Sequence, residues 1–149
     1  MTRRPRWQSE EGSELIEFAL VTPILILLLA GIFDFGMMFR SYEAVTNAAR
    51  EGARIAVLPG YGQADVQARV AQYLAAAGLK STPSVAYTAP QAMSVGGACV
   101  TITGVTVGYP HQFLFIGKLV GLFGGSGFTT TTLTATARMR YEGAASTCS

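Results

Sequence analysis

Glu17 is the residue of this sequence whose position most needs a chemical explanation. It stands immediately before an uncharged apolar run, FALVTPILILLLAGIF (residues 18–33). An ionised carboxylate near the centre of a bilayer costs roughly 2.5–3.5 kcal/mol on insertion scales, and less near the interface. One interpretation is that Glu17 only reaches the headgroup boundary. The other interpretation requires a partner charge. Cleavage after Gly12 would supply that charge as the new α-amino group of Ser13, one helical turn from Glu17.

The remaining candidates for chemistry form no catalytic or metal-binding pattern. His111, the single histidine, follows Pro110 and has no carboxylate or cysteine nearby in the sequence, so we expect a loop histidine with no special role. Nucleophile-elbow, zinc-protease, phosphate-loop and paired-cysteine motifs do not occur in the sequence, although a site assembled from distant residues stays open. We predict that the protein is not an enzyme and uses no metal or cofactor.

Cys99 and Cys148 are the only cysteines of the chain. They are either two separate buried thiols or one disulfide formed in an oxidising compartment. The topology that follows from the apolar run places both residues outside the cytoplasm, which favours the disulfide.

The apolar run predicts a membrane-spanning helix. Residues 18–33 would extend about 24 Å as a helix, whereas residues 15–39 would extend about 37 Å and cover a hydrocarbon core of about 30 Å. The longer segment includes Glu17 and Asp34. A cleaved secretory signal is the alternative interpretation, but the run is long and no small-x-small site closes it.

Charges on the two sides of the run predict its orientation. Three arginines lie in the first six residues, and Asp34, Arg40 and Glu43 follow the run, so the positive-inside rule places the N-terminus in the cytoplasm. We therefore expect a cytoplasmic leader (1–12), a transmembrane helix (13–39) and a periplasmic or extracellular domain (40–149). The net charge of +2 comes from scattered residues, which argues against nucleic acid as a partner. The composition, half apolar and only 13% charged, indicates membrane lipid as a partner.

The exported part is predicted to be an α+β domain in which helices pack on a three-stranded, mostly antiparallel sheet. Apolar and small residues at steps of three and four predict a helix over 40–57 that continues from the anchor, and a second helix over 65–77. Alternating patterns predict strands over 84–88, 99–109 and 129–141, with a bulge at Gly104. The apolar stretch 111–123 is predicted to be a helix that is buried in the core or forms a membrane-proximal or partner-binding patch.

Three segments resemble a known family. The segment GSELIEF (12–18) resembles a type IV prepilin cleavage site: a glycine, four residues, a glutamate, an aromatic residue and then a long apolar run. The run itself and NAAREGAR (47–54) resemble the core of TadE-like proteins, and TATARMRYE (134–142) resembles the last strand of that family. The close resemblance covers about residues 10–58, with a looser match at the end of the chain.

The resemblance implies a TadE-like minor pilin, or pseudopilin, that acts in assembly of a Tad (Flp) type IV pilus used for adhesion. A prepilin peptidase would cut after Gly12, so that Ser13 becomes the first residue, and Glu17 with Phe18 would serve processing or assembly. The implied partners are the peptidase, other pilin and minor pilin subunits and the inner-membrane assembly platform. The implied location is the bacterial inner membrane, crossed once. The alternative is an unprocessed single-pass scaffold of a pilus or secretion complex.

Overall fold

The computed structural model describes residues 10–122 and 130–141. One long helix, α1 (Glu10–Ala56), contains 47 residues and therefore extends about 70 Å. It confirms the prediction that the apolar segment and the following amphipathic segment form a single helix. The helix ends shortly before Gly60, whose φ of 86° belongs to a region that glycine adopts without steric cost.

The sheet has three antiparallel strands in the order β1 (Ser84–Val95), β2 (Ala98–Gln112) and β3 (Thr130–Arg140). The predicted α+β class is confirmed. Gly96 and Gly97 both have positive φ and form the two-residue turn between β1 and β2, as tight hairpins require.

β1 is longer than its predicted range of 84–88. Its pairing with β2 shifts register between Thr88 and Gln91, and the strand then continues past Pro90. Proline has no N–H to give to a ladder, and an edge strand with an irregularity tolerates it. The register shift lies beside Gly104, which pairs with Thr88, but the one additional residue belongs to β1. The predicted bulge on Gly104 is therefore wrong.

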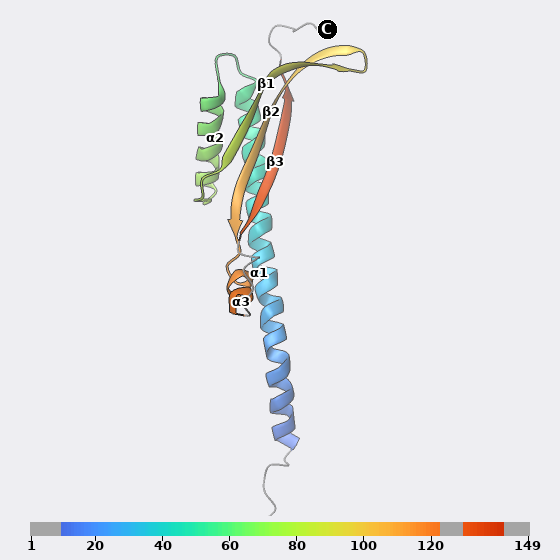
Figure 1. Ribbon diagram of the computed structural model, residues 1–149, viewed down its shortest axis with the longest axis vertical. Helices are drawn as coiled ribbons and strands as arrows, with labels where there is room; N and C mark the ends of the chain where they lie inside the picture. The colour runs from blue at the N-terminus through green and yellow to red at the C-terminus, as the bar shows by residue number, and fades with distance from the viewer. Residues whose placement is uncertain (1–9, 123–129, 142–149) are drawn as a thin grey trace, which may run out of the picture.

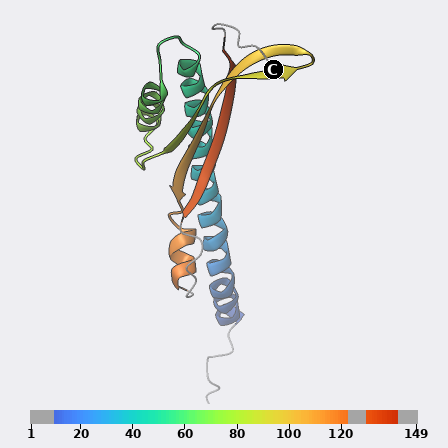
Figure 2. The ribbon, with the colours of Figure 1, turned by 45° about the horizontal axis from the view of Figure 1, so that its top comes forward.

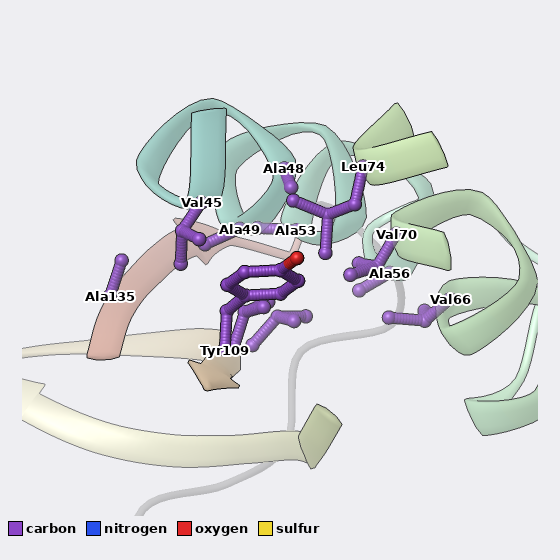
Figure 3. Close-up of a cluster of buried hydrophobic side chains, with 12 residues drawn as sticks. Val45, Ala48, Ala49, Ala53, Ala56, Val66, Val70, Leu74, Tyr109 and Ala135 are labelled. Atoms are coloured by element: carbon purple, nitrogen blue, oxygen red, sulfur yellow. The ribbon is translucent and has the colours of Figure 1, made fainter. Parts of the chain in front are cut away.

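The core lies where α1, the second helix α2 (Gln63–Ala76) and one face of the sheet meet. Figures 1 and 2 show these elements gathered about the C-terminal half of α1, while its N-terminal part projects alone. Small residues on α1 allow the close packing that Figure 3 shows around Tyr109. The core residues are Val45, Ala48, Ala49, Ala53, Ala56, Val66, Val70, Leu74, Val105, Val107, Tyr109 and Ala135.

The third helix, α3 (Ile116–Leu122), is shorter than the predicted 111–123. His111 and Gln112 instead extend β2, where they pair with Thr131 and Thr130. Figure 1 shows α3 beside α1, between the lower end of the sheet and the projecting part of α1.

Candidate functional site

The predicted processing residues lie together at the start of α1. Gly12, Ser13, Glu17 and Phe18 occupy its first turns, and all except the half-buried Gly12 are exposed. The bond between Gly12 and Ser13 is in the first turn, where backbone N–H groups have no intrahelical acceptor. Ser13 and Glu17 are four residues apart and so lie on one face of the helix.

The N-terminal part of α1 has an apolar surface that the rest of the chain does not cover. Side chains from residue 13 to residue 29 are exposed apart from Thr22, and they include Leu15, Phe18, Ile24 and Leu27. Within the described residues, this is the one helix long and apolar enough to cross a membrane. An exposed apolar surface of this length requires an apolar environment. These properties are those of a single-pass membrane anchor.

Asp34 is the polar centre of the contact between α1 and α3. Its side chain is fully buried and accepts backbone hydrogen bonds from three consecutive residues, the two that precede α3 and its first residue. Leu114 N donates to Oδ1 at 3.0 Å, Phe115 N to Oδ1 at 3.2 Å and Oδ2 at 2.9 Å, and Ile116 N to Oδ2 at 2.6 Å. A carboxylate at this position satisfies helix N–H groups that have no intrahelical partner.

Aromatic rings flank Asp34 on both sides. Phe33 lies 6.5 Å from Phe115, and Phe35 lies 6.4 Å from Phe113, measured between ring centroids. Sequence reasoning treated Asp34 only as a charge at the end of the anchor and missed this role. Two features of the sequence could have indicated this contact. One is a carboxylate inside an apolar helix, and the other is a second apolar segment whose first N–H groups need an acceptor.

His111 was predicted to be a loop histidine, but it lies in β2 and is 7% exposed. Its ring meets Phe113 edge-on with centroids 5.5 Å apart. Burial lowers the pKa of His111 from its usual 6.5, and the negative charge of Asp34 offsets part of this effect. His111 also lines a half-open cavity of about 790 Å³, together with Arg40, Lys80 and other residues.

An ion cluster joins α1 to α2 at the other end of the domain. Glu51 accepts hydrogen bonds from Arg69 at 2.7 Å and from Arg54 at 2.9 Å. The hydrogen bonds from Arg69 and then Arg54 lower the pKa of Glu51 below its usual 4.5. No local pattern in the sequence predicts this cluster, because Arg69 lies 18 residues from Glu51. In the described ranges, no group of three or more His, Cys, Asp or Glu side chains could hold a metal ion.

The two cysteines are not both within the described residues. Cys99 lies near the start of β2, far along the chain from the processing residues, whereas Cys148 lies outside the described residues. The predicted disulfide therefore stays a prediction.

Comparison with known proteins gives one match. A family model described as TadE-like protein matches residues 12–54, from Gly12 to the last turn of α1. The match covers the anchor and the buried stripe of that helix, and none of the sheet. No curated protein and no solved structure matches the chain. The match agrees with the resemblance of the cleavage motif and of NAAREGAR, and it shows that the segment 12–54 is similar to TadE-like proteins.

Proposed function

We propose that this protein is a minor pilin, or pseudopilin, that acts in assembly of a Tad type IV pilus and is cut by a prepilin peptidase between Gly12 and Ser13. The observation that carries this proposal is that the family match begins at Gly12 itself. The proposed bond therefore lies at the edge of the segment that defines the family, directly before an exposed apolar helix.

The local structure is compatible with cleavage. A peptidase must take the bond into its active site, and the first turn of a helix frays more readily than its interior. Gly12 favours fraying further, because glycine is about 1 kcal/mol less favourable than alanine in a helix. The residues after the bond are exposed, so no part of the described domain blocks access to it.

Glu17 is proposed to act after cleavage. The new amino group of Ser13 would lie one turn from the Glu17 carboxylate, either on the same chain or on a neighbouring subunit. Opposite charges that meet inside an apolar environment reduce the unfavourable free energy of burying each one. Such a pair would fix the register between adjacent helices in a filament, with Phe18 packed beside it.

In this proposal the N-terminus faces the cytoplasm and the sheet domain faces the periplasm. After extraction from the membrane, the exposed face of residues 13–29 would exchange lipid for the helices of other pilin subunits. The sheet domain, which packs on the other half of α1 (Figure 2), would remain on the outside and initiate or cap the filament. The partners are the peptidase, other pilin subunits and the assembly platform of the inner membrane.

The first test is the intact mass of the protein purified from membranes of a host with its own prepilin peptidase. We expect a mature chain that starts at Ser13, and an uncut chain for Gly12→Ala. Gly36→Ala is the matched control, because it makes the same substitution in the same helix where an added Cβ meets nothing within 4 Å. This control should be cut as the wild type is. An intact N-terminus in every variant would refute processing and favour a permanently anchored scaffold.

A second measurement separates processing from assembly. Glu17→Gln keeps the size of the side chain and removes its charge. We expect this variant to be cut after Gly12 but to be depleted from purified pilus fractions. Incorporation equal to that of the wild type would refute the proposed pairing with the Ser13 amine.

A further inference from the structure

The buried stripe of α1 begins deeper in the anchor than the predicted domain boundary at residue 40. Ala30 is 8% exposed and Asp34 is fully buried, although both lie in the predicted transmembrane segment 13–39. Figure 1 shows that α3 runs beside this part of α1. The small side chain of Ala30, one turn from Asp34, permits close approach between two helices, as small residues do in membrane helix pairs.

The length of α1 locates Asp34 relative to a bilayer. If the hydrocarbon core begins at Leu15, a thickness of about 30 Å ends near residue 35. Asp34 would then lie at the far boundary of the core. Because α3 extends from Asp34 alongside the anchor (Figure 1), its seven residues would reach about 10 Å into the lipid.

Hydrogen bonding at Asp34 suits this location. In hydrocarbon no water is available, so the free N–H groups of a helix start and a lone carboxylate are each unfavourable. Here the two groups satisfy each other, since one carboxylate accepts four hydrogen bonds from three backbone N–H groups. The first N–H groups of a helix exposed to water would not need a carboxylate, because water molecules would accept their hydrogen bonds.

The exposed apolar surface just before α3 is continuous with the anchor surface. Leu114 and Phe115 are 51% and 48% exposed, and Phe115 contacts Phe33, which is itself an exposed residue of the anchor. Lys118 is the one charged residue of α3 and is exposed. It lies only about 3 Å beyond the start of the helix, so its long side chain can reach lipid phosphates at the boundary.

We propose that residues 113–122 insert into the bilayer leaflet farther from the N-terminus, with Phe115 and Leu114 among the acyl chains and the Asp34 contact at the boundary. The protein is then held in the membrane by α1 and by α3, and its sheet domain sits directly on the lipid surface. The inference rests on the membrane anchor of the proposed function, and on neither peptidase cleavage nor filament assembly.

The test is the membrane depth of a single tryptophan in the full chain reconstituted into vesicles. Trp7, the only native tryptophan, is first replaced by phenylalanine. Phe115→Trp then reports on α3, Ile24→Trp on the anchor, and Tyr61→Trp on an exposed residue in the loop before α2. Lipids brominated along the acyl chain quench tryptophan inside the bilayer, and iodide quenches tryptophan in water.

We expect Phe115→Trp to be quenched by brominated lipid several-fold more than Tyr61→Trp, and iodide to quench the two in the opposite order. Asp34→Ala added to Phe115→Trp should reduce quenching by brominated lipid, and Asp34→Asn, which keeps one acceptor oxygen, should reduce it less. These results would support insertion of α3.

Three results would overturn the proposal. In the first, iodide quenches Phe115→Trp as strongly as Tyr61→Trp while brominated lipid quenches Ile24→Trp. This result would mean that α3 lies in water although the anchor is in the membrane. If neither quencher reaches Phe115→Trp, another protein surface or a second copy of the chain covers it. If brominated lipid fails to quench Ile24→Trp, the anchor itself is refuted, and α3 insertion with it.

Discussion

Gly52→Ala tests the closest approach between α1 and the two elements packed on it. An added Cβ at residue 52 would lie 2.8 Å from Cγ2 of Val70 in α2 and 3.3 Å from Cγ1 of Val105 in β2. Favourable separations between carbon atoms are about 3.5–4.0 Å. Both valines are fully buried and have short, stiff side chains, so neither can move aside without disturbing the core.

The magnitude follows from comparison with Gly36→Ala, for which no atom lies within 4 Å of the added Cβ. Both substitutions stabilise the helix by about 1 kcal/mol through propensity. Only Gly52→Ala adds overpacking, which typically destabilises by about 1–3 kcal/mol. The two variants should therefore differ by about 1–3 kcal/mol in the free energy of unfolding, with Gly52→Ala the less stable.

The assay is denaturant unfolding of the full chain in detergent micelles, followed by circular dichroism. Val70→Ala removes the Cγ2 atom that the new Cβ would meet. In a double-mutant cycle, Gly52→Ala should be better tolerated in the Val70→Ala background, with a coupling of about 1 kcal/mol or more, as is usual for residues in contact. Equal effects of Gly52→Ala and Gly36→Ala, or additive effects with Val70→Ala, would refute the close approach.

Three further predictions concern polar contacts. Asp34→Ala leaves three backbone N–H groups without their acceptor, each unfavourable by about 1 kcal/mol or more. Amide hydrogen exchange at residues 114–116 should therefore rise several-fold, and less in Asp34→Asn; unchanged exchange would contradict the contact. Because the folded state lowers the pKa of Glu51 below 4.5, its charge stabilises the fold above that pH, and the contribution is lost as the pH falls through the lowered value. The stability difference between wild type and Glu51→Gln, measured by unfolding over a pH series, should shrink below pH 4.5, and a constant difference would disprove it. If Cys99 and Cys148 form the predicted disulfide, the intact mass of the chain should rise by two hydrogen atoms on reduction. Equal masses before and after reduction would show two thiols.

Much of the fold could be predicted from the sequence, because the decisive patterns are local. An uncharged run specifies a helix that needs an apolar environment, and alternation of valine with threonine specifies strands. The single α1 and the three antiparallel strands were predicted on these grounds, and the TadE-like segment was predicted from its resemblance to that family. The errors at His111, at Gly104 and in the length of β1 concern where a strand ends or bulges. Those positions depend on how each strand pairs with its neighbour, which the local pattern of a single strand does not specify.

The residues of the candidate site also fall into two groups, those that a local pattern predicts and those that depend on distant contacts. Gly12, Ser13, Glu17 and Phe18 could be proposed from the sequence because the resemblance to a prepilin cleavage site depends only on their spacing along one segment. The role of Asp34 and the link from Glu51 to α2 could not be found, because the donors to Asp34 lie 80–82 residues away and Arg69 lies 18 residues from Glu51 in the chain. Sequence by itself determined an apolar anchor helix that begins with a segment resembling a prepilin cleavage site. Only the tertiary structure placed α3 beside that anchor, because a hydrogen bond between distant residues exists only once the chain has brought them together.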